Sequence, residues 1–252
     1  MASKEAKSKV YRRSEPANTG AEGASQFRYR LADWEIPKAI IDDFTQHQTP
    51  LSYRKGAVIF PQGSRSDFLG WTHSGVIETA YCEVDGRRIV TRLVGPGEII
   101  GYQSLVGPDG HLVHGFELRA RTECQVALVS HERVVKALQT LAPAALVRLL
   151  QNITAAWAET ERYWARFFTL NYRRRLETIF ADLTVRFGTR GPHGEVLMLE
   201  LGHYDLAGMI GCSRPMLSQL IATMIREGKI SRRDKRYILL NGKKRLAVPG
   251  RG

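Results

Sequence analysis

Asp205 to Ile221 reads DLAGMIGCSRPMLSQLI, a pattern typical of two short helices joined by a tight turn. Ala207 is small, which suits a point where two helices cross closely, and Gly211 supplies the turn. Ser213 can cap the second helix, and Pro215 is tolerated in the first turn of that helix. The segment therefore predicts a helix-turn-helix.

The second helix of this motif has a polar outward face. The apolar side chains expected to form the core of the motif are Met209, Ile210, Leu217, Leu220, Ile221 and Met224. The side chains expected on or near the outward face, where DNA would bind, are Ser213, Arg214, Pro215, Ser218, Gln219 and Thr223. Arg214 and Gln219 are the predicted base readers, because Arg can bind guanine through O6 and N7 and Gln can bind adenine. Ser213 and Ser218 are predicted to touch phosphate, and the alternative interpretation is a plain three-helix bundle with solvated charges.

The segments around this motif complete the carboxyl-terminal third. The patterns predict helices over 172–187, 203–211 and 213–227, a turn-rich loop over 188–194 and short strands over 229–241. The last two strands resemble a wing whose basic side chains suit contacts to the DNA backbone: Arg232, Arg233, Lys235 and Arg236.

The charge of the 252-residue chain is concentrated in this third. The formal net charge is +12, and residues 171–252 hold 16 Lys/Arg against 7 Asp/Glu, a net +9. Residues 31–170 carry a net −1 and residues 1–30 a net +4. A neutral module joined to a basic one predicts a polyanionic partner, with nucleic acid favoured because neutralising phosphates releases counterions. A membrane surface is the alternative, but the basic region lacks a long amphipathic helix with a wide apolar face.

Several functional classes find no support in the sequence. No apolar run approaches the roughly 20 residues of a membrane span, and residues 1–30 lack the apolar segment of a secretory signal, so a soluble cytoplasmic protein is expected. The three cysteines are far apart and form no C-x-x-C pair, which argues against a disulfide framework and a Cys-based metal site. The sequence contains no nucleophile elbow, phosphate loop or His-Glu-x-x-His motif, so no enzyme is expected.

The amino-terminal half shows a change from polar sequence to short strands. Residues 1–26 are polar and are expected to be disordered, and residues 31–48 are expected to form a short helix or two. Residues 51–130 read as many short strands, and Asp85-Gly86 between two of them is a strong hairpin motif. Glycines recur at intervals of 7 to 12 residues, at Gly56, Gly63, Gly75, Gly86 and Gly97. This spacing favours a β-roll or barrel over a parallel sheet.

A long helix is predicted to begin near Pro143, with an apolar seam at alternating spacings of four and three. The seam consists of Leu146, Leu150, Ile153, Trp157, Thr160, Trp164 and Phe167. It could be a coiled-coil contact between two chains, or it could pack on its own β domain. Both can hold, because one helix has two faces.

With these motifs in order, the sequence resembles the Crp–Fnr family of bacterial transcription regulators over about residues 50–241. The amino-terminal likeness lies in Tyr53-Arg54-Lys55-Gly56, Ser74-Gly75, Asp85-Gly86-Arg87 and Pro96-Gly97-Glu98-Ile99-Ile100-Gly101. The carboxyl-terminal likeness lies in Arg175-Leu176, which opens a helix, and in Asp205-Leu206-Ala207 through Gly211-Cys212-Ser213-Arg214.

The resemblance implies an α+β protein with a cyclic-nucleotide-binding-like double-stranded β-roll, a long dimerisation helix and a winged helix-turn-helix. The expected parts are a disordered tail over 1–26, a sensor domain over 27–142, a dimerisation helix and hinge over 143–170, and a DNA-binding domain over 171–252. The dimer interface is expected at Leu146, Leu150, Ile153, Trp157 and Trp164. Such a homodimer would bind a palindromic promoter site on double-stranded DNA, and an activator of this kind would also contact RNA polymerase.

Departures from the family pattern bear on the ligand and on the DNA site. Members that bind cyclic AMP carry a Glu where this chain has Tyr102 and an Arg–Ser pair where it has His114-Gly115, so cyclic AMP is not the expected effector. The amino-terminal tail has no iron–sulfur cysteines, and the spacing of His73, His111, His114 and Cys82 does not select haem ligands. Pro215 replaces a Glu that accepts a hydrogen bond from cytosine, so the half-site should differ at that base.

The resemblance also points to an effector site between the roll and the long helix. Thr160 and Glu161 correspond to the positions from which that helix touches cyclic AMP. Aromatic side chains crowd the same helix, so we expect a small aromatic or other organic metabolite. The expected contacts are Tyr102, Gln103, His114, Trp157, Thr160, Glu161 and Trp164. The alternatives are that these aromatics only pack the dimer and hinge, that Cys82 or Cys124 acts as a redox switch, or that the regulator needs no ligand.

Overall fold

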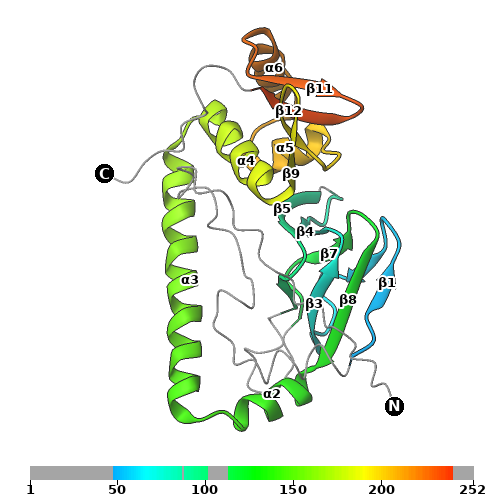
Figure 1. The fold of residues 1–252 in the computed structure, drawn as a ribbon, viewed down its shortest axis with the longest axis vertical. Helices are drawn as coiled ribbons and strands as arrows, with labels where there is room; N and C mark the ends of the chain where they lie inside the picture. The colour runs from blue at the N-terminus through cyan, green and yellow to red at the C-terminus, as the bar shows by residue number, and fades with distance from the viewer. Residues whose placement is uncertain (1–47, 87, 102–112, 241–252) are drawn as a thin grey trace, which may run out of the picture.

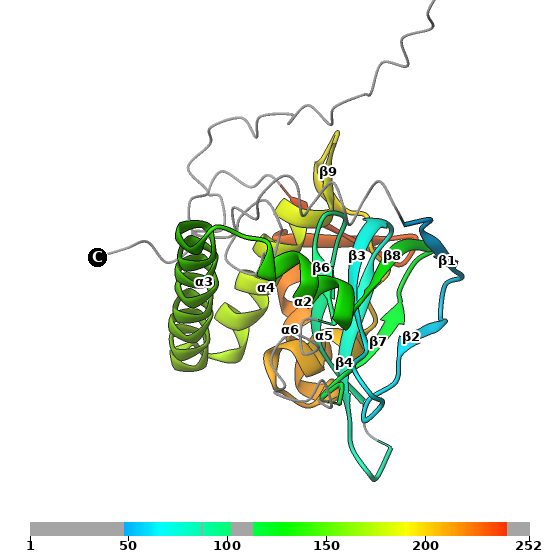
Figure 2. The same ribbon diagram turned by 90° about the horizontal axis from the view of Figure 1, so that it is seen from below.

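A computed structural model of the chain describes residues 48–86, 88–101 and 113–240. The tail predicted over 1–26 and the helix predicted over 31–48 therefore lie outside the described residues, apart from position 48. Figures 1 and 2 show a roll of strands, a long helix beside it, and a carboxyl-terminal domain that sits at one end of the roll. No helix in the described ranges has the length and apolar character needed to span a membrane.

The roll consists of two four-stranded antiparallel sheets, with strand orders β1-β8-β3-β6 and β2-β7-β4-β5. The strands are β1 (Leu51–Tyr53), β2 (Val58–Phe60), β3 (Phe68–Ser74), β4 (Ile77–Cys82), β5 (Arg88–Val94), β6 (Ile99–Ile100), β7 (Glu117–Ala120) and β8 (Cys124–Ser130). Residues from both sheets fill the space between them, including Phe60, Ile77, Ile100, Leu118 and Val126. The predicted double-stranded β-roll is confirmed.

The Asp85-Gly86 turn joins β4 to β5 as the sequence predicts. Cys82 pairs with Arg88 at the register position nearest the turn, and Gly86 has a φ of +84°. A side chain is disfavoured at this φ, which explains the glycine.

Two helices follow the roll. Helix α2 (His131–Gln139) starts on a Ser130 cap, and α3 (Pro143–Thr169) has its proline in the first turn, as predicted. The outer face of the first sheet packs against both helices through Leu69, Ile99, Val129, Val134 and Leu149. This contact fixes the beginning of α3 on the roll, while the rest of the helix runs beside it toward the carboxyl-terminal domain (Figure 1).

The carboxyl-terminal domain contains three helices and a four-stranded sheet of order β11-β12-β10-β9. Its elements are α4 (Tyr172–Phe187), β9 (Gly188–Gly191), β10 (Gly194–Leu197), α5 (His203–Ile210), α6 (Arg214–Arg226), β11 (Ile230–Arg233) and β12 (Arg236–Leu240). The loop predicted over 188–194 is instead largely a hairpin, because β10 pairs with β12 more than 40 residues away and β9 adds to its free edge. Local turn residues do not reveal such distant pairing.

The core of the predicted helix-turn-helix is confirmed. Ile210, Leu217, Ile221 and Met224 are buried, and Met209 and Leu220 are partly buried against them. Ala207 is also buried, at the place where the sequence predicts a close crossing of helices.

Candidate nucleic-acid interface

The turn between α5 and α6 has the geometry that its sequence predicts. Gly211 ends α5 in the left-handed region with a φ of +72°. The Ser213 hydroxyl accepts a hydrogen bond from the Met216 amide at 3.4 Å, and Pro215 lies in the first turn of α6. These residues set the angle between the two helices and leave the amino-terminal end of α6 at the surface.

The outward face of α6 is accessible over its first turns. Ser213, Arg214, Pro215 and Gln219 are exposed, as a helix that enters a major groove requires. Ser218 differs, because its hydroxyl donates to the Arg214 carbonyl at 3.0 Å and lies 2.9 Å from Nδ1 of His203 on α5. Thr223, nearer the end of α6, is half-buried.

Positive charge gathers around the face that Arg214 occupies. Burial lowers the pKa of His203, and the nearby charges of Arg232 and Arg214 lower it further. His203 therefore remains a neutral hydrogen-bonding partner of Ser218 at neutral pH. The cations come from α6 and from the wing, which are the two elements that the sequence assigns to DNA.

The predicted two-stranded wing is formed by β11 and β12. Arg232, Arg233 and Lys235 are exposed, Arg236 is half-buried, and the guanidinium of Arg232 lies 5.4 Å from the ring centre of Tyr237. The tip of the hairpin is a two-residue turn in which both residues have positive φ: Asp234 at 49° and Lys235 at 65°. Glycine is favoured at the second of these positions, so a lysine there is held against its backbone preference.

Replacing Lys235 by Gly is expected to raise the free energy of unfolding by about 0.5–1 kcal/mol, because the positive φ no longer opposes a side chain. The same change should weaken binding to all DNA sequences alike and reduce the salt slope by about one phosphate contact. Chemical denaturation and binding titrations at several salt concentrations measure the two effects. Unchanged DNA affinity would show that this cation does not reach a phosphate.

Arg175 is a functional candidate whose structural role the sequence did not indicate. Its guanidinium donates to the carbonyls of Phe168 at 3.0 Å, Leu170 at 3.0 Å and Ile210 at 3.1 Å. The first two carbonyls belong to the end of α3, and the third belongs to the last residue of α5. Arg175 thus joins the hinge to the turn of the helix-turn-helix, and its only trace in the sequence is the Arg175-Leu176 pair of the family pattern.

The sensor roll holds one predicted effector residue in an unusual state. His114 is 1% exposed and stacks on Phe60, with ring centres 4.4 Å apart. Both of its ring nitrogens are buried without a hydrogen-bond partner among the described residues, and burial lowers the pKa of His114. A buried imidazole in this state has unused donor and acceptor capacity. Tyr102 and Gln103, also predicted to contact the effector, fall outside the described residues.

The comparisons with known proteins agree with this architecture. Residues 50–140 match the cyclic nucleotide-binding domain, and residues 174–247 match the Crp-like helix-turn-helix domain. The chain belongs to the Crp–Fnr family of transcription regulators. It is 26% identical to the CRP-like protein Clp of Xanthomonas campestris over 204 residues, which is 79% of this chain and 87% of Clp.

Two solved structures illustrate that its fold is shared. The structure of CLP from Xanthomonas campestris, described as a c-di-GMP-responsive global regulator, superposes with a TM-score of 0.67 at 25% identity and covers 81% of this chain and all of that one. FixK2 from Bradyrhizobium japonicum superposes with a TM-score of 0.65 at 20% identity, covering 79% and 95% of the two chains.

The predicted effector residues on α3 of this Crp–Fnr regulator lie in different surroundings. The Trp157 side chain is exposed, and its indole N–H donates to Oε1 of Glu161 at 2.9 Å on the same helix. Thr160, which lies between Trp157 and Glu161 in the sequence, is half-buried. Trp164 instead stacks on Phe168 in an aromatic cluster at the end of the helix. Their contact with an effector stays a prediction.

The apolar seam of α3 is divided between two environments. Its early members are uncovered in the single chain: Leu146 is 37% exposed, Leu150 is 56% exposed and Trp157 is 65% exposed. Phe167, at the other end, is 2% exposed and belongs to the core of the carboxyl-terminal domain. The seam therefore packs on its own chain at the end of α3 and at Ile153, which is partly buried against the roll, and it leaves Leu146, Leu150 and Trp157 as an uncovered apolar face.

The cysteines offer little support to the redox alternative. All three are free, and burial raises the pKa of the Cys124 and Cys212 thiols. A raised pKa reduces the thiolate fraction, which is the reactive form. Within the described ranges, no group of three or more His, Cys, Asp or Glu side chains is arranged to hold a metal ion.

Proposed function

We propose that this Crp–Fnr regulator acts as a homodimer on a palindromic promoter site, with a small organic effector bound in the β-roll. The observation that carries the proposal is the accessible first turns of α6, flanked by the basic wing, in the same chain as an uncovered apolar face on α3. A palindromic site is read by two recognition helices, and a two-fold symmetric dimer that pairs through α3 would supply both. Cytoplasmic location and contact with RNA polymerase belong to the same proposal, and no catalytic role is assigned.

The effector is proposed to contact His114, whose two buried ring nitrogens have no hydrogen-bond partner in the part of the chain that the structure describes. A neutral imidazole can offer one donor and one acceptor, which suits a polar edge of a planar organic molecule. It cannot replace the bidentate fork of an arginine on a cyclic phosphate, so cyclic AMP remains disfavoured. Because the relative CLP is described as c-di-GMP-responsive, c-di-GMP is the first ligand to test.

Sequence selection from a random DNA pool by the purified protein tests the proposed function. We expect a palindrome bound at least about 10³-fold more tightly than bulk DNA at fixed salt. The selection is repeated with cyclic AMP and with c-di-GMP, and the His114→Phe variant is the control for ligand dependence. Steep salt dependence without any sequence preference would identify a general polyanion binder instead.

A further inference from the structure

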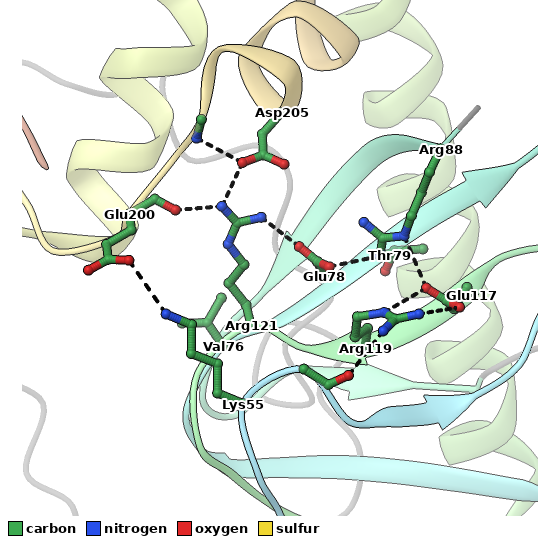
Figure 3. A network of polar contacts seen from close by, with 12 residues as sticks. Lys55, Val76, Glu78, Thr79, Arg88, Glu117, Arg119, Arg121, Glu200 and Asp205 are labelled. Atoms are coloured by element: carbon green, nitrogen blue, oxygen red, sulfur yellow. Dashed lines mark hydrogen bonds and ion pairs between the residues drawn. The ribbon is translucent and has the colours of Figure 1, made fainter. Parts of the chain in front are cut away.

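A charged contact joins the roll to the carboxyl-terminal domain, and Arg121 lies at its centre (Figure 3). Arg121 follows β7, and its backbone amide donates to the Val76 carbonyl at 2.7 Å, which holds it in the roll. Its guanidinium donates to Oε2 of Glu78 at 2.7 Å, again within the roll. The same guanidinium donates to Oδ2 of Asp205 at 2.6 Å and to the Glu200 carbonyl, both in the carboxyl-terminal domain.

The partner of Arg121 is itself part of the helix-turn-helix. Asp205 lies in the first turn of α5, and its Oδ2 also accepts from the Gly202 amide at 2.9 Å. Burial alone would raise the pKa of Asp205, but the hydrogen bonds from Arg121 and Gly202 bring it below its ordinary value. The carboxylate is therefore charged at neutral pH, and Arg121 forms an ion pair with it at the amino-terminal end of α5.

Apolar packing and a second hydrogen bond hold α5 on the roll beside this ion pair. Gly208 on α5 lies so close to β5 that an added Cβ would be 3.3 Å from Cγ2 of Ile89. Val90 of the roll shares one hydrophobic core with the residues of α5. The Tyr204 hydroxyl accepts from the Arg88 amide at 3.0 Å. Helix α5 is thus docked on β5 along its length, and α6 is carried by α5.

We infer that Arg121 is a positioning residue that fixes the recognition helix relative to the sensor roll. The inference rests on the proposed function, because a dimer reads a palindrome only when its two recognition helices are held about one helical turn of DNA apart. Without Arg121, α5 and the α6 it carries would be held on the roll by apolar packing, the Tyr204 contact and the Lys55–Glu200 ion pair. The buried Arg186–Glu98 ion pair would still hold α4 on the roll, but it does not touch α5. Each recognition helix would still bind a half-site. The spacing between the two helices of the dimer would be less well fixed, so binding to both half-sites at once would weaken.

Replacing Arg121 by Gln should leave the fold intact. Glu78 keeps its ion pair with Arg88 at 2.8 Å, and Asp205 keeps the Gly202 amide. Arg119, two residues earlier on β7, provides a matched control, because its guanidinium donates to Glu117 at 2.9 Å and to the Gly56 carbonyl at 3.1 Å without leaving the roll. The pair Arg121→Gln and Arg119→Gln therefore removes the same chemistry with and without the contact between domains.

The experiment measures the affinity of both variants for the selected palindrome, for an isolated half-site and for palindromes lengthened or shortened by one base pair. For Arg121→Gln we expect the ratio of palindrome to half-site affinity to fall about tenfold, with weaker discrimination against altered spacing. Arg119→Gln should change the ratio less than about twofold. Asp205→Asn, which keeps the cap, should reproduce the loss, and the double variant should lose little more. Equal losses on both sites, or in both Arg variants, would overturn the inference.

Hydrogen exchange of the free protein gives a measurement that does not depend on DNA. Amides of α5 should exchange about tenfold faster in Arg121→Gln than in the wild type or in Arg119→Gln, because the helix loses its anchor. Unchanged exchange in α5 would overturn the inference even if palindrome binding were confirmed. If the wild type lacked palindrome preference while α5 exchange still rose, the proposed function would fail and the anchor would stand.

Discussion

Leu150→Glu is expected to convert the protein from a dimer to a monomer and to lower its affinity for the palindrome by about 10³-fold or more. Leu150 is 56% exposed in the single chain and lies between Leu146 and Trp157 on the free face of α3. In a two-fold interface, this one substitution would place two carboxylates, one from each chain, in apolar surroundings without partners. The monomer would then bind one half-site, with an affinity close to that for non-specific DNA.

Gln151→Glu is the matched control for this prediction. Gln151 is exposed on the same helix, but it points away from the seam, so the same charge stays in water. Sedimentation gives the mass of each variant, and binding titrations give the affinity. Because Leu150 is exposed in the single chain, thermal melting of the monomer should still show a folded protein. A Leu150→Glu variant that remains dimeric would place the dimer contact elsewhere on the chain.

The helix-turn-helix could be predicted almost to the residue because its constraints are local. Gly211 satisfies a left-handed turn, Ser213 caps the following helix, and Pro143 starts α3, all within a few positions of the feature that they determine. The glycine at the β4–β5 turn is predictable for the same reason. A positive φ or a missing amide restricts the choice of residue strongly enough to be visible in a single sequence.

Features that depend on distant partners were not predictable. Arg121 and Asp205 are 84 positions apart, and in the sequence each is one charged residue among many. The β9–β10 hairpin depends on pairing with β12, and Ser218 looks like an outward residue until His203 is placed beside it. The seam of α3 shows one period along its length, although its end and Ile153 pack on their own chain while Leu150 and Trp157 are exposed.

Arg214→Ala is expected to cost about 1–3 kcal/mol of binding free energy at each half-site, roughly 5- to 150-fold, and to relax the choice of one base pair there. Arg214 is the first residue of α6 and is exposed, which places its guanidinium where a recognition helix first meets base edges. Its loss would remove the predicted bidentate contact to guanine but only one of several positive charges on this face.

A change in sequence specificity, rather than in affinity alone, distinguishes a base contact of Arg214 from a phosphate contact. The measurement is a set of sites with each base changed in turn, bound by the wild type, by Arg214→Ala and by Arg226→Ala at one salt concentration. Arg226 is exposed at the far end of the same helix, so its loss removes an equal charge away from the expected groove contact. If Arg214 reads a base, Arg214→Ala should lose discrimination among bases at one position of the half-site and keep it at the others. If Arg214→Ala weakened every sequence equally, as Arg226→Ala should if it matters at all, the guanidinium would be a phosphate contact and Gln219 would be left as the base reader.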